Sequence, residues 1–341
     1  MKKSKLTTLL VTLTLTITTF LTGCVVIGDD TDRANHYKIA IVKYVDDASL
    51  NQIEAAIETQ LESREKELGV TFEVKLYNGQ ADSAVLNQIA ADVLAEDVDA
   101  VVPIATPAAV LMQAATEDTD IPVIFSAVTD PQDAGLVASN DAPGSNVTGI
   151  SDAIDTEAIM KLIVLQNPDI KKIGLLYDKG QASSLGSIED AKAFCKEHSI
   201  EVVEKTGTNV NEIQTAADVL VAEKVEAIFT PQDNTVMQAE MAIFEKFTDA
   251  KIPHYTGADS FALNGAFIGY GVNYEQLGAL TGNMVIDIVV KGQNPATTAV
   301  KTLEGGILMV NTETAEKLNI DYSIFKYECE ELKETTTKQE F

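Results

Sequence analysis

The segment Thr106–Ala109 places a hydroxyl side chain, a proline and two alanines directly after an apolar run. The run predicts a buried strand over 98–104, and proline is favoured at the first position of a helix, so a helix should start at Pro107. The first N–H groups of a helix lack partners within it, and the helix dipole makes this end positive. Small side chains let a carboxylate approach the backbone. Thr106, Pro107 and Ala108 are therefore predicted to bind an anionic group, the alternative being that Thr106 only caps its own helix.

Carboxylates that could accept hydrogen bonds from an ammonium group follow predicted strands at three other places. These are Asp130, Asp233 and Asp259. Each has a structural alternative: Asp130 precedes a proline, as turn residues often do, and Asp259 could lie in a loop. Asp233 could cap the helix that follows it, with Asn234 an equal candidate for that cap. We predict ligand contacts for all three aspartates and for Asn234.

Arginine occurs only at Arg33 and Arg64. Arg33 lies in a polar N-terminal segment, and Arg64 lies late on a helix that should end away from the carboxyl ends of the strands. No bidentate guanidinium–carboxylate pair is therefore expected. An anionic ligand group would have to use backbone N–H groups, hydroxyls or Lys, which argues against phosphorylated sugars and dicarboxylates.

Aromatic contacts to a ligand would have to come from Tyr or Phe, because the chain has no Trp. Tyr44 ends the first predicted strand and is the best candidate. Phe125, Phe229 and Tyr255 lie in or beside strands, where core packing is the expected role.

The sequence shows few of the motifs that are typical of enzymes. It contains neither a Gly-x-Ser-x-Gly elbow nor a phosphate-binding P-loop. Cys195 and His198 have the spacing of two metal ligands on a helix, but no further Cys or His lies nearby, so an ordinary surface helix is preferred. We expect no enzymatic activity, no catalytic or metal-binding residue and no cofactor.

The elements that position these residues occur twice along the chain. Strand and helix patterns alternate from Lys38 onward, with Ser49 and Gln52 predicting the cap of the first helix. The order returns after residue 170, and residues 225–229 match residues 98–102 position for position. The expected fold class is α/β, with two similar doubly wound parallel-sheet lobes. Ligands of such sheets bind at the carboxyl ends of the strands, here in a cleft between the lobes.

The domain boundaries follow from this repeat. A hinge is expected near Ser151-Asp152, where the first lobe has no further strands, and the chain should return to that lobe near Tyr274. Lobe 1 is assigned to 37–152 plus about 275–300, lobe 2 to 153–274 plus about 301–326, and a flexible acidic tail to 327–341.

Residues 1–23 have the composition of an export signal. Three lysines precede an uncharged apolar run that is too short and too Thr-rich for a comfortable membrane span, and it ends in Leu21-Thr22-Gly23-Cys24. Small residues before a Cys resemble a bacterial lipoprotein signal, which implies lipidation of Cys24; the alternative is a plain secretory signal. Residues 24–36 then read as an anchor and tether, and the protein as extracytoplasmic, lipid-anchored to the outer face of the bacterial cell membrane.

The net charge and the cysteines exclude other classes. A formal net charge of −27 offers no electrostatic means of holding a nucleic-acid backbone, so no nucleic acid is expected as a partner. Three Cys cannot form a disulfide framework, and we expect Cys195 and Cys329 to be free thiols.

Together with the lipidation motif and the duplicated lobes, several strand-end motifs resemble the substrate-binding lipoproteins of ABC importers, and most closely the subfamily associated with tryptophan and tyrosine. These motifs cover nearly all of 38–320 and are Ile104-Ala105-Thr106-Pro107-Ala108-Ala109, Val128-Thr129-Asp130-Pro131, Asn146-Val147-Thr148-Gly149-Ile150-Ser151-Asp152, Thr230-Pro231-Gln232-Asp233-Asn234-Thr235-Val236 and Asn273-Tyr274-Glu275-Gln276-Leu277-Gly278. The resemblance implies the type I periplasmic-binding-protein fold.

Two segments depart from the pattern of this family. The family's Glu-x-Asn-Ser after the first strand of lobe 2 is Gln181-Ala182-Ser183-Ser184 here, and its Asp-Tyr is Asn273-Tyr274. The acid is absent, so the contacts that the resemblance implies from this loop reduce to Ser183 and Ser184.

The resemblance implies a monomeric receptor that closes over a small zwitterionic amino acid, aromatic in this subfamily, and delivers it to an ABC permease and its ATPase. Two alternatives from other classes stay open at this point. One is a surface sensor or adhesin that uses the same fold, and the other is an exported hydrolase.

Overall fold

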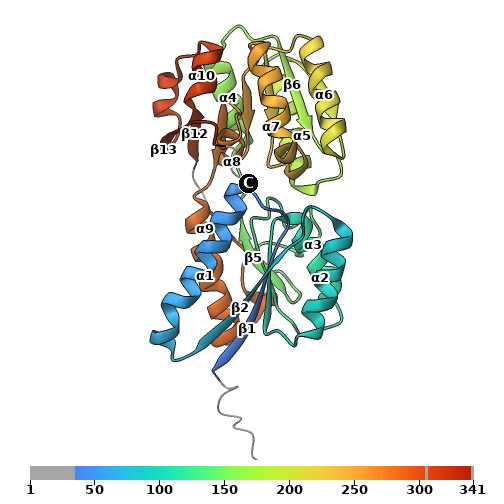
Figure 1. Ribbon diagram of the computed structural model, residues 1–341, viewed down its shortest axis with the longest axis vertical. Coiled ribbons are helices and arrows are strands. Elements are labelled where there is room, and N and C mark those ends of the chain that lie inside the picture. Colours follow the sequence, from blue (N-terminus) through green and yellow to red (C-terminus); the bar gives the residue numbers. More distant parts are fainter. Residues whose placement is uncertain (1–34, 304–305, 339–341) are drawn as a thin grey trace, which may run out of the picture. The chain divides into compact units, whose positions relative to one another are not determined.

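The computed structural model describes residues 35–303 and 306–338, which form two α/β lobes (Figure 1). Cys24, the predicted signal and most of the predicted tether lie outside the described residues. Within these ranges, none of the helices combines the length and the apolar character needed to cross a membrane.

Lobe 1 has a parallel six-stranded sheet in the order β11-β5-β4-β3-β1-β2. Its strands are β1 (His36–Lys43), β2 (Thr71–Asn78), β3 (Ala100–Ile104), β4 (Val123–Ser126), β5 (Val147–Ser151) and β11 (Lys301–Thr302). Helices α1 (Ala48–Leu68) and α9 (Tyr274–Val285) lie on one face, and α2 (Ser83–Ala95) and α3 (Thr106–Thr116) lie on the other (Figure 1). A π-helical turn (Ile286–Val290) continues α9, and a short 3₁₀ helix (Pro295–Thr297) precedes β11.

Lobe 2 has a seven-stranded sheet in the order β13-β12-β10-β9-β8-β6-β7. Its strands are β6 (Lys172–Tyr177), β7 (Glu201–Thr206), β8 (Ala227–Thr230), β9 (His254–Thr256), β10 (Ile268–Gly271), β12 (Ile307–Asn311) and β13 (Glu331–Thr335). Its helices are α4 (Thr156–Gln166), α5 (Ala182–Glu197), α6 (Val210–Ala222), α7 (Asn234–Asp249), α8 (Asp259–Leu263) and α10 (Thr312–Leu318), with a 3₁₀ helix at Tyr322–Tyr327. The sheet is parallel except that β12 runs antiparallel to β10.

The predicted tail is partly an element of lobe 2, so the boundary at 327 is wrong. Residues Glu331–Thr335 form β13, which pairs in parallel with β12. The end of lobe 1 also moves, because Lys301–Thr302 pairs with β5 in the sheet of lobe 1. The chain thus passes between lobes three times: from β5 to α4, from β10 to α9, and from β11 to β12.

Burial and capping explain the first helix. Ile53, Ile57 and Leu61 are fully buried on one face of α1, which stabilises the lobe by about 1.5–3 kcal/mol for each side chain. The N-cap is Asp47, whose side chain accepts hydrogen bonds from Ser49 N and Leu50 N, so the predicted cap at Ser49 is wrong.

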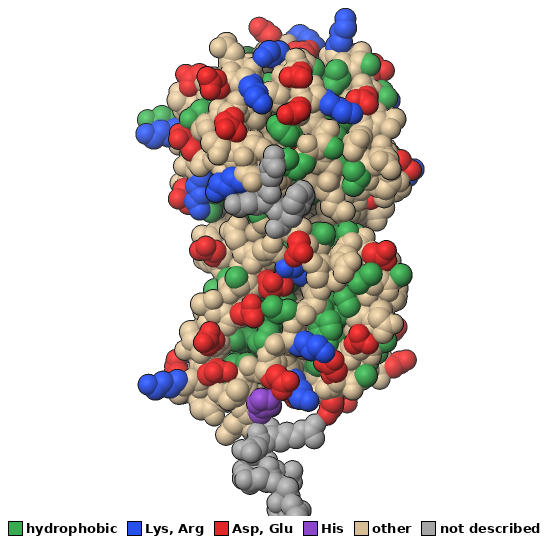
Figure 2. Space-filling view, viewed as in Figure 1, with side chains coloured by type: hydrophobic (Ala, Val, Ile, Leu, Met, Phe, Trp, Pro, Cys, Tyr) green, Lys and Arg blue, Asp and Glu red, His purple; other side chains and the backbone are tan. Residues whose placement is uncertain are grey.

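The surface carries many acidic side chains, and two cysteines lie in the described part of the chain. Figure 2 shows Asp and Glu side chains scattered over the visible face of the molecule, with Lys and Arg among them. Cys195 is buried and Cys329 is partly buried, and both are free, which confirms the prediction of two thiols.

Candidate functional site

A cavity lies between the carboxyl ends of the two sheets. It measures about 440 Å³ including the part open to solvent. Most of its wall comes from the first turns of helices and the loops just before them, as expected for doubly wound sheets. The lining residues are Asp47, Ser49, Leu50, Ala105, Thr106, Ala127, Thr129, Asp152, Ser183, Gln232, Asp233, Asn234, Met237, Ala258, Ser260, Phe261 and Tyr274.

The start of α3 reaches this cavity without a side-chain cap. Its N-cap is Ala105, at φ 78°, and no side chain accepts from its first N–H groups. Thr106 is 4% exposed, and its Oγ1 has no hydrogen-bond partner. A left-handed φ is costly for alanine and is typical of functional sites. The alternative in which Thr106 caps its own helix is not what the structure shows, and the helix end is free to bind an anion.

The start of α5 reaches the cavity from lobe 2 and, like the start of α3, has no side-chain cap. Its N-cap residue, Gln181, makes no side-chain capping bond. Ser183 is 5% exposed and lines the cavity, and its Oγ also lacks a partner. Ser184 points elsewhere, because its hydroxyl donates to Asp233 Oδ2 over 2.7 Å. Two uncapped helix starts, each with a buried unpaired hydroxyl, therefore meet the same cavity.

Four buried aspartates surround the cavity or lie directly behind its wall. Burial raises the pKa of Asp152 to about 7 and the pKa values of Asp233 and Asp259 to about 6, and it also raises the pKa of Asp47. The cause is the loss of water around each carboxylate. Among the described residues that line the cavity there is neither Lys nor Arg. The wall therefore favours a positively charged ligand group.

Asp233 serves first as the cap of α7. Its Oδ1 accepts from Thr235 N at 3.0 Å and Val236 N at 2.9 Å. Its Oδ2 accepts from Asp178 N and Ser184 Oγ, both at 2.7 Å. The cap is thus Asp233 and not Asn234, whose side-chain amide donates to Gln181 Oε1 over 3.0 Å. The first two bonds cap α7, and the other two join its start to the end of β6 and to α5, all within lobe 2.

Hydrogen bonds also join the two lobes beside the cavity. Gln232 of lobe 2 donates to the backbone oxygen and to Oδ2 of Asp152, both at 2.9 Å. Thr129 of lobe 1 donates to Gln232 Oε1 over 2.9 Å. Ser49 of lobe 1 donates to Asp259 Oδ1 of lobe 2 over 2.7 Å. These bonds form only when the lobes are close enough to enclose a small molecule.

Apolar side chains complete the wall. Phe261 and Tyr274 are 1% and 3% exposed, and Leu50 and Met237 lie with them around the cavity. These side chains offer an aromatic or aliphatic group a dry surface next to the polar helix ends.

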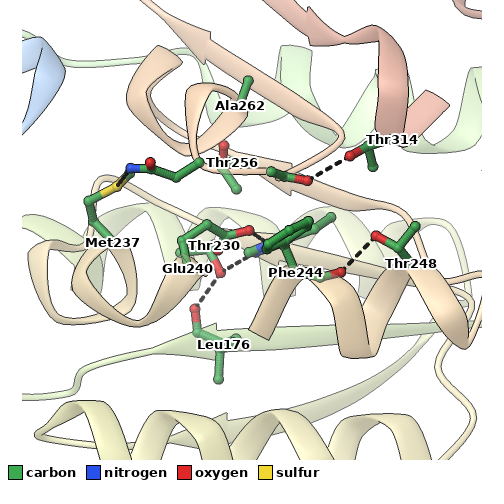
Figure 3. A network of polar contacts seen from close by, with 12 residues as sticks. Leu176, Thr230, Met237, Glu240, Phe244, Thr248, Thr256, Ala262 and Thr314 are labelled. Atoms are coloured by element: carbon green, nitrogen blue, oxygen red, sulfur yellow. Dashed lines mark hydrogen bonds and ion pairs between the residues drawn. The ribbon is translucent and has the colours of Figure 1, made fainter. Parts of the chain in front are cut away.

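A network of buried polar contacts lies in lobe 2 and includes Leu176, Thr230 and Glu240 (Figure 3). His254 contacts Glu240 Oε1 at 3.1 Å and Thr230 Oγ1 at 2.8 Å, and Thr230 donates to Leu176 O over 2.9 Å. The His254 ring meets the ring of Phe261 edge-on at 6.3 Å. The network therefore ties three strands of lobe 2 to α7 and supports an aromatic side chain of the cavity.

The structure brings Thr106, Ser183, Asp233 and Asn234, predicted from the sequence, to the cavity wall. It does not bring the others there. Ala108 is fully buried in a core cluster of lobe 1, and Pro107 follows Thr106 in the first turn of α3. Ser184 lies behind the wall, bonded to Asp233.

Three further predicted residues lie near the cavity but outside its lining. Asp130 closes a turn by accepting from Gln132 N and Asp133 N at 3.1 and 3.0 Å. Asp259 is bonded to Ser49, so its neighbours Ala258 and Ser260 form the wall. Tyr44 is partly buried, and its hydroxyl approaches Ala81 O at 3.5 Å. Burial raises the pKa of Tyr44, and the charges of Asp178 and Asp233 across the cavity raise it further.

The sequence reasoning missed several wall residues. Asp152 ends the motif Asn146–Asp152, and Asp47 follows the first strand, so both had the same signal as Asp130, Asp233 and Asp259. Gln232 and Tyr274 also lie within such motifs. Phe261 carries no signal, because its placement depends on the short helix α8. Within residues 35–303 and 306–338, no group of His, Cys, Asp and Glu is arranged to hold a metal ion.

Comparisons with known proteins agree with this geometry. A family described as ABC transporter substrate binding protein matches residues 38–327. A tyrosine-binding protein of Clostridioides difficile is 29% identical over 290 residues, which are 85% of this chain and 83% of that protein.

Two solved structures are similar in fold and sequence. One is a Streptococcus pneumonia ABC domain in complex with L-Trp, with a TM-score of 0.80 and 31% identity, covering 87% of this chain and 99% of that one. The other is the ligand-free, open structure of a substrate-binding protein with adhesive properties from Clostridium difficile. Its TM-score is 0.68 at 28% identity, covering 89% of this chain and 100% of that one.

Proposed function

Because the chain belongs to the ABC transporter substrate-binding protein family, we propose that it binds an aromatic amino acid as the zwitterion and delivers it to an ABC permease. One observation carries the ligand class: a cavity lined by buried aspartates, and by neither Lys nor Arg among its described residues, receives two uncapped helix starts. Such a wall suits a ligand with one anionic and one cationic end.

The carboxylate of the ligand would bind where α3 and α5 begin. The free N–H groups, the positive ends of both helices and the hydroxyls of Thr106 and Ser183 are all donors that the protein leaves unpaired. A carboxylate would satisfy them. Each buried donor or acceptor without a partner costs about 1–3 kcal/mol, which ligand binding would recover.

The amino group and the side chain would use the rest of the wall. The buried aspartates favour the ammonium group, and Phe261, Tyr274, Leu50 and Met237 favour an aromatic ring. The tyrosine-binding relative and the relative bound to L-Trp support this choice, and a small aliphatic amino acid would leave part of the apolar wall uncovered.

An anchor at the membrane would keep the protein close to its permease. We propose that Cys24 is lipidated after removal of residues 1–23 and that the mature protein is a monomer on the outer face of the cell membrane. The lipidation motif at Leu21–Cys24 supports the anchor. Incorporation of labelled fatty acid into the wild-type protein, and its loss in Cys24→Ala, would test it.

Adhesion is a second candidate function. A relative with 28% identity over nearly its whole length has adhesive properties. The two functions are compatible, because adhesion would use the outer surface and ligand binding the cavity. A binding assay on host cells separates the two, with bacteria that display the wild type or Thr106→Asp, a cavity variant that should no longer bind the amino acid.

Calorimetry of the purified protein against the twenty amino acids tests the ligand class. We expect Trp, Tyr or Phe to bind with a Kd in the micromolar range or tighter, about −8 kcal/mol or more favourable. At 100 times the Kd the same ligand should stabilise the protein by about 2.7 kcal/mol, visible as a higher melting temperature. Absence of heat and of a thermal shift with every amino acid would refute the proposal.

A further inference from the structure

We infer that Asp47 is the residue that binds the ammonium group of the ligand. The inference rests on the proposed function, because it assumes a zwitterionic ligand in the cavity.

Three of the four buried aspartates at the cavity or behind its wall already have partners within the protein. Asp233 accepts four hydrogen bonds, two on each oxygen. Asp152 accepts from Gln232 Nε2 at 2.9 Å and from Thr129 Oγ1 at 3.4 Å. Asp259 accepts from Ser49 Oγ at 2.7 Å. Their carboxylates hold the lobes together or cap a helix, which explains their presence without a ligand.

Asp47 differs from them. Its Oδ1 accepts from Ser49 N at 2.9 Å and Leu50 N at 3.2 Å, which completes the cap of α1. Its Oδ2 is buried and makes no hydrogen bond of good geometry within the protein, and among the described cavity aspartates it is the carboxylate oxygen in that condition. The hydroxyls of Ser260 and Ser49 lie close enough to this carboxylate to lower its pKa against the larger effect of burial. The residue is 6% exposed and lines the cavity. A buried carboxylate oxygen left without a donor is a place where an ammonium group would bind strongly.

A capping role alone does not require an aspartate here. Asn and Ser cap helices about as well as Asp, because a cap uses one oxygen. Only an acid supplies a second oxygen and a full negative charge toward the cavity. Ser49 and Leu50, which follow Asp47 in α1, also line the cavity, so one side of the first turn faces it.

Asp47 lies at the junction of the two lobes, where a ligand ammonium group could contact residues of both. Asp47 lies in lobe 1 and Ser260 and Asp259 in lobe 2, and Ser49–Asp259 joins the lobes at this point. A ligand ammonium at Asp47 would therefore sit where the two lobes meet. Because α3 also starts in lobe 1, that lobe would hold both ends of the zwitterion, with lobe 2 closing over them.

The test compares Asp47→Asn with a matched variant at another helix cap. Asp82 caps α2 through Ala84 N at 2.6 Å and Val85 N at 3.2 Å, as Asp47 caps α1, but it does not line the cavity. Calorimetry would use the aromatic amino acid that binds best and its analogue that lacks the amino group. Melting temperatures of the ligand-free proteins report on folding.

We expect Asp47→Asn to weaken binding of the amino acid by about 30-fold or more, as expected for loss of a buried charge partner. Its binding of the analogue without the amino group should stay the same or improve, because Asp47 then faces no cation. Asp82→Asn should change neither. Asp47→Ser should behave as Asp47→Asn does, and ligand-free melting temperatures of both should stay close to the wild type.

Other outcomes overturn the inference. If Asp47→Asn weakens both ligands equally, the residue acts through the fold, and if it weakens neither, the ammonium binds elsewhere; in both cases the proposed function stands. If the wild type binds no amino acid at all, the proposed function and the inference fall together.

Discussion

Helices α3 and α7 occupy equivalent positions in the two lobes, but only α7 has a side-chain cap at its first turn. Each follows the strand that pairs beside the first strand of its lobe, β3 beside β1 and β8 beside β6. The start of α3 has no side-chain cap and an unpaired hydroxyl at Thr106, whereas the start of α7 is capped by Asp233.

The other pair of equivalent helices shows the reverse. Helix α1 follows β1 and is capped by Asp47, and α5 follows β6 and has no side-chain cap. Within these two pairs of equivalent helices, each lobe therefore has one start with a side-chain cap and one without. The starts of α8 and α9 also line the cavity; Asn273 caps α9, and α8 has no side-chain cap. The caps decide which helix starts remain available to a ligand.

Thr106→Asp should nearly abolish binding. A carboxylate in the first turn of α3 would accept from the free N–H groups and repel the carboxylate of the ligand. We expect the Kd for the amino acid to rise by about 100-fold or more, which is about 2.7 kcal/mol. The ligand-free protein should melt at the same or a slightly higher temperature, because an acid near a helix start is favourable.

Thr106→Val is the control for this change. It removes the hydroxyl but leaves the helix start open, so the Kd should rise only about tenfold, the effect of one lost hydrogen bond. Calorimetry measures both variants. Equal affinities of Thr106→Asp and the wild type would mean that the ligand carboxylate does not bind at α3.

Asp233→Ala should reduce stability before it reduces affinity. Two of the hydrogen bonds to this carboxylate cap α7, and the other two join it to Asp178 N and Ser184 Oγ. The loss of all four should lower the free energy of unfolding by about 2–4 kcal/mol. Urea denaturation measures it, and Asp233→Asn, which keeps a cap, should lose less. Weaker binding at unchanged stability would instead place Asp233 in contact with the ligand.

The fold could be predicted further than the site. Buried runs such as Ile39–Val42 and the repeated segment at 225–229 are strong signals, because a strand covered on both faces must be apolar. Strand β13 has no such signal. It lies at the edge of its sheet, carries Glu331, Lys333 and Glu334, and is held mainly by backbone pairing with β12.

The sequence alone does not predict which residue caps each helix that starts at the cavity. Asp47 and Ser49 are both good N-cap residues two positions apart, and propensity alone does not choose between them. Thr106 has the right type for a cap, yet Ala105 takes that position with a left-handed φ. Such strained local choices depend on packing around the cavity, and they mark the site more clearly than residue type does.

Stability should fall as the pH rises through the range in which the buried acids ionise. Burial raises the pKa of Asp152 to about 7, against about 3.9 in an unfolded chain, so the folded protein binds more protons between these values. The contribution is fully present below about pH 4 and is lost as the pH rises through 7. We expect the ligand-free protein to melt about 2–5 °C higher at pH 5 than at pH 8.

Asp152→Asn should flatten this dependence, because the amide cannot ionise, while its oxygen can still accept from Gln232. Differential scanning calorimetry across the pH range measures both proteins. A melting temperature that rises from pH 5 to pH 8 in the wild type, or the same slope in both proteins, would show that Asp152 ionises as an ordinary surface acid does.

Asp130→Ala should have the smallest effect. The motif around Asp130 and its place after a strand predicted a ligand contact, but its carboxylate accepts from Gln132 N and Asp133 N and the residue does not line the cavity. Removing this partly buried turn cap should cost about 1 kcal/mol of stability or less and leave the Kd within about twofold. A tenfold weaker affinity would mean that the loop after β4 moves onto the ligand when it binds. In that case the ligand would contact both the uncapped start of α3 and the carboxylate of Asp130, which accepts hydrogen bonds from its own turn in the ligand-free protein. A group that caps a turn in the ligand-free protein could then also bind the ligand, so its hydrogen bonds there would not identify the ligand-binding groups.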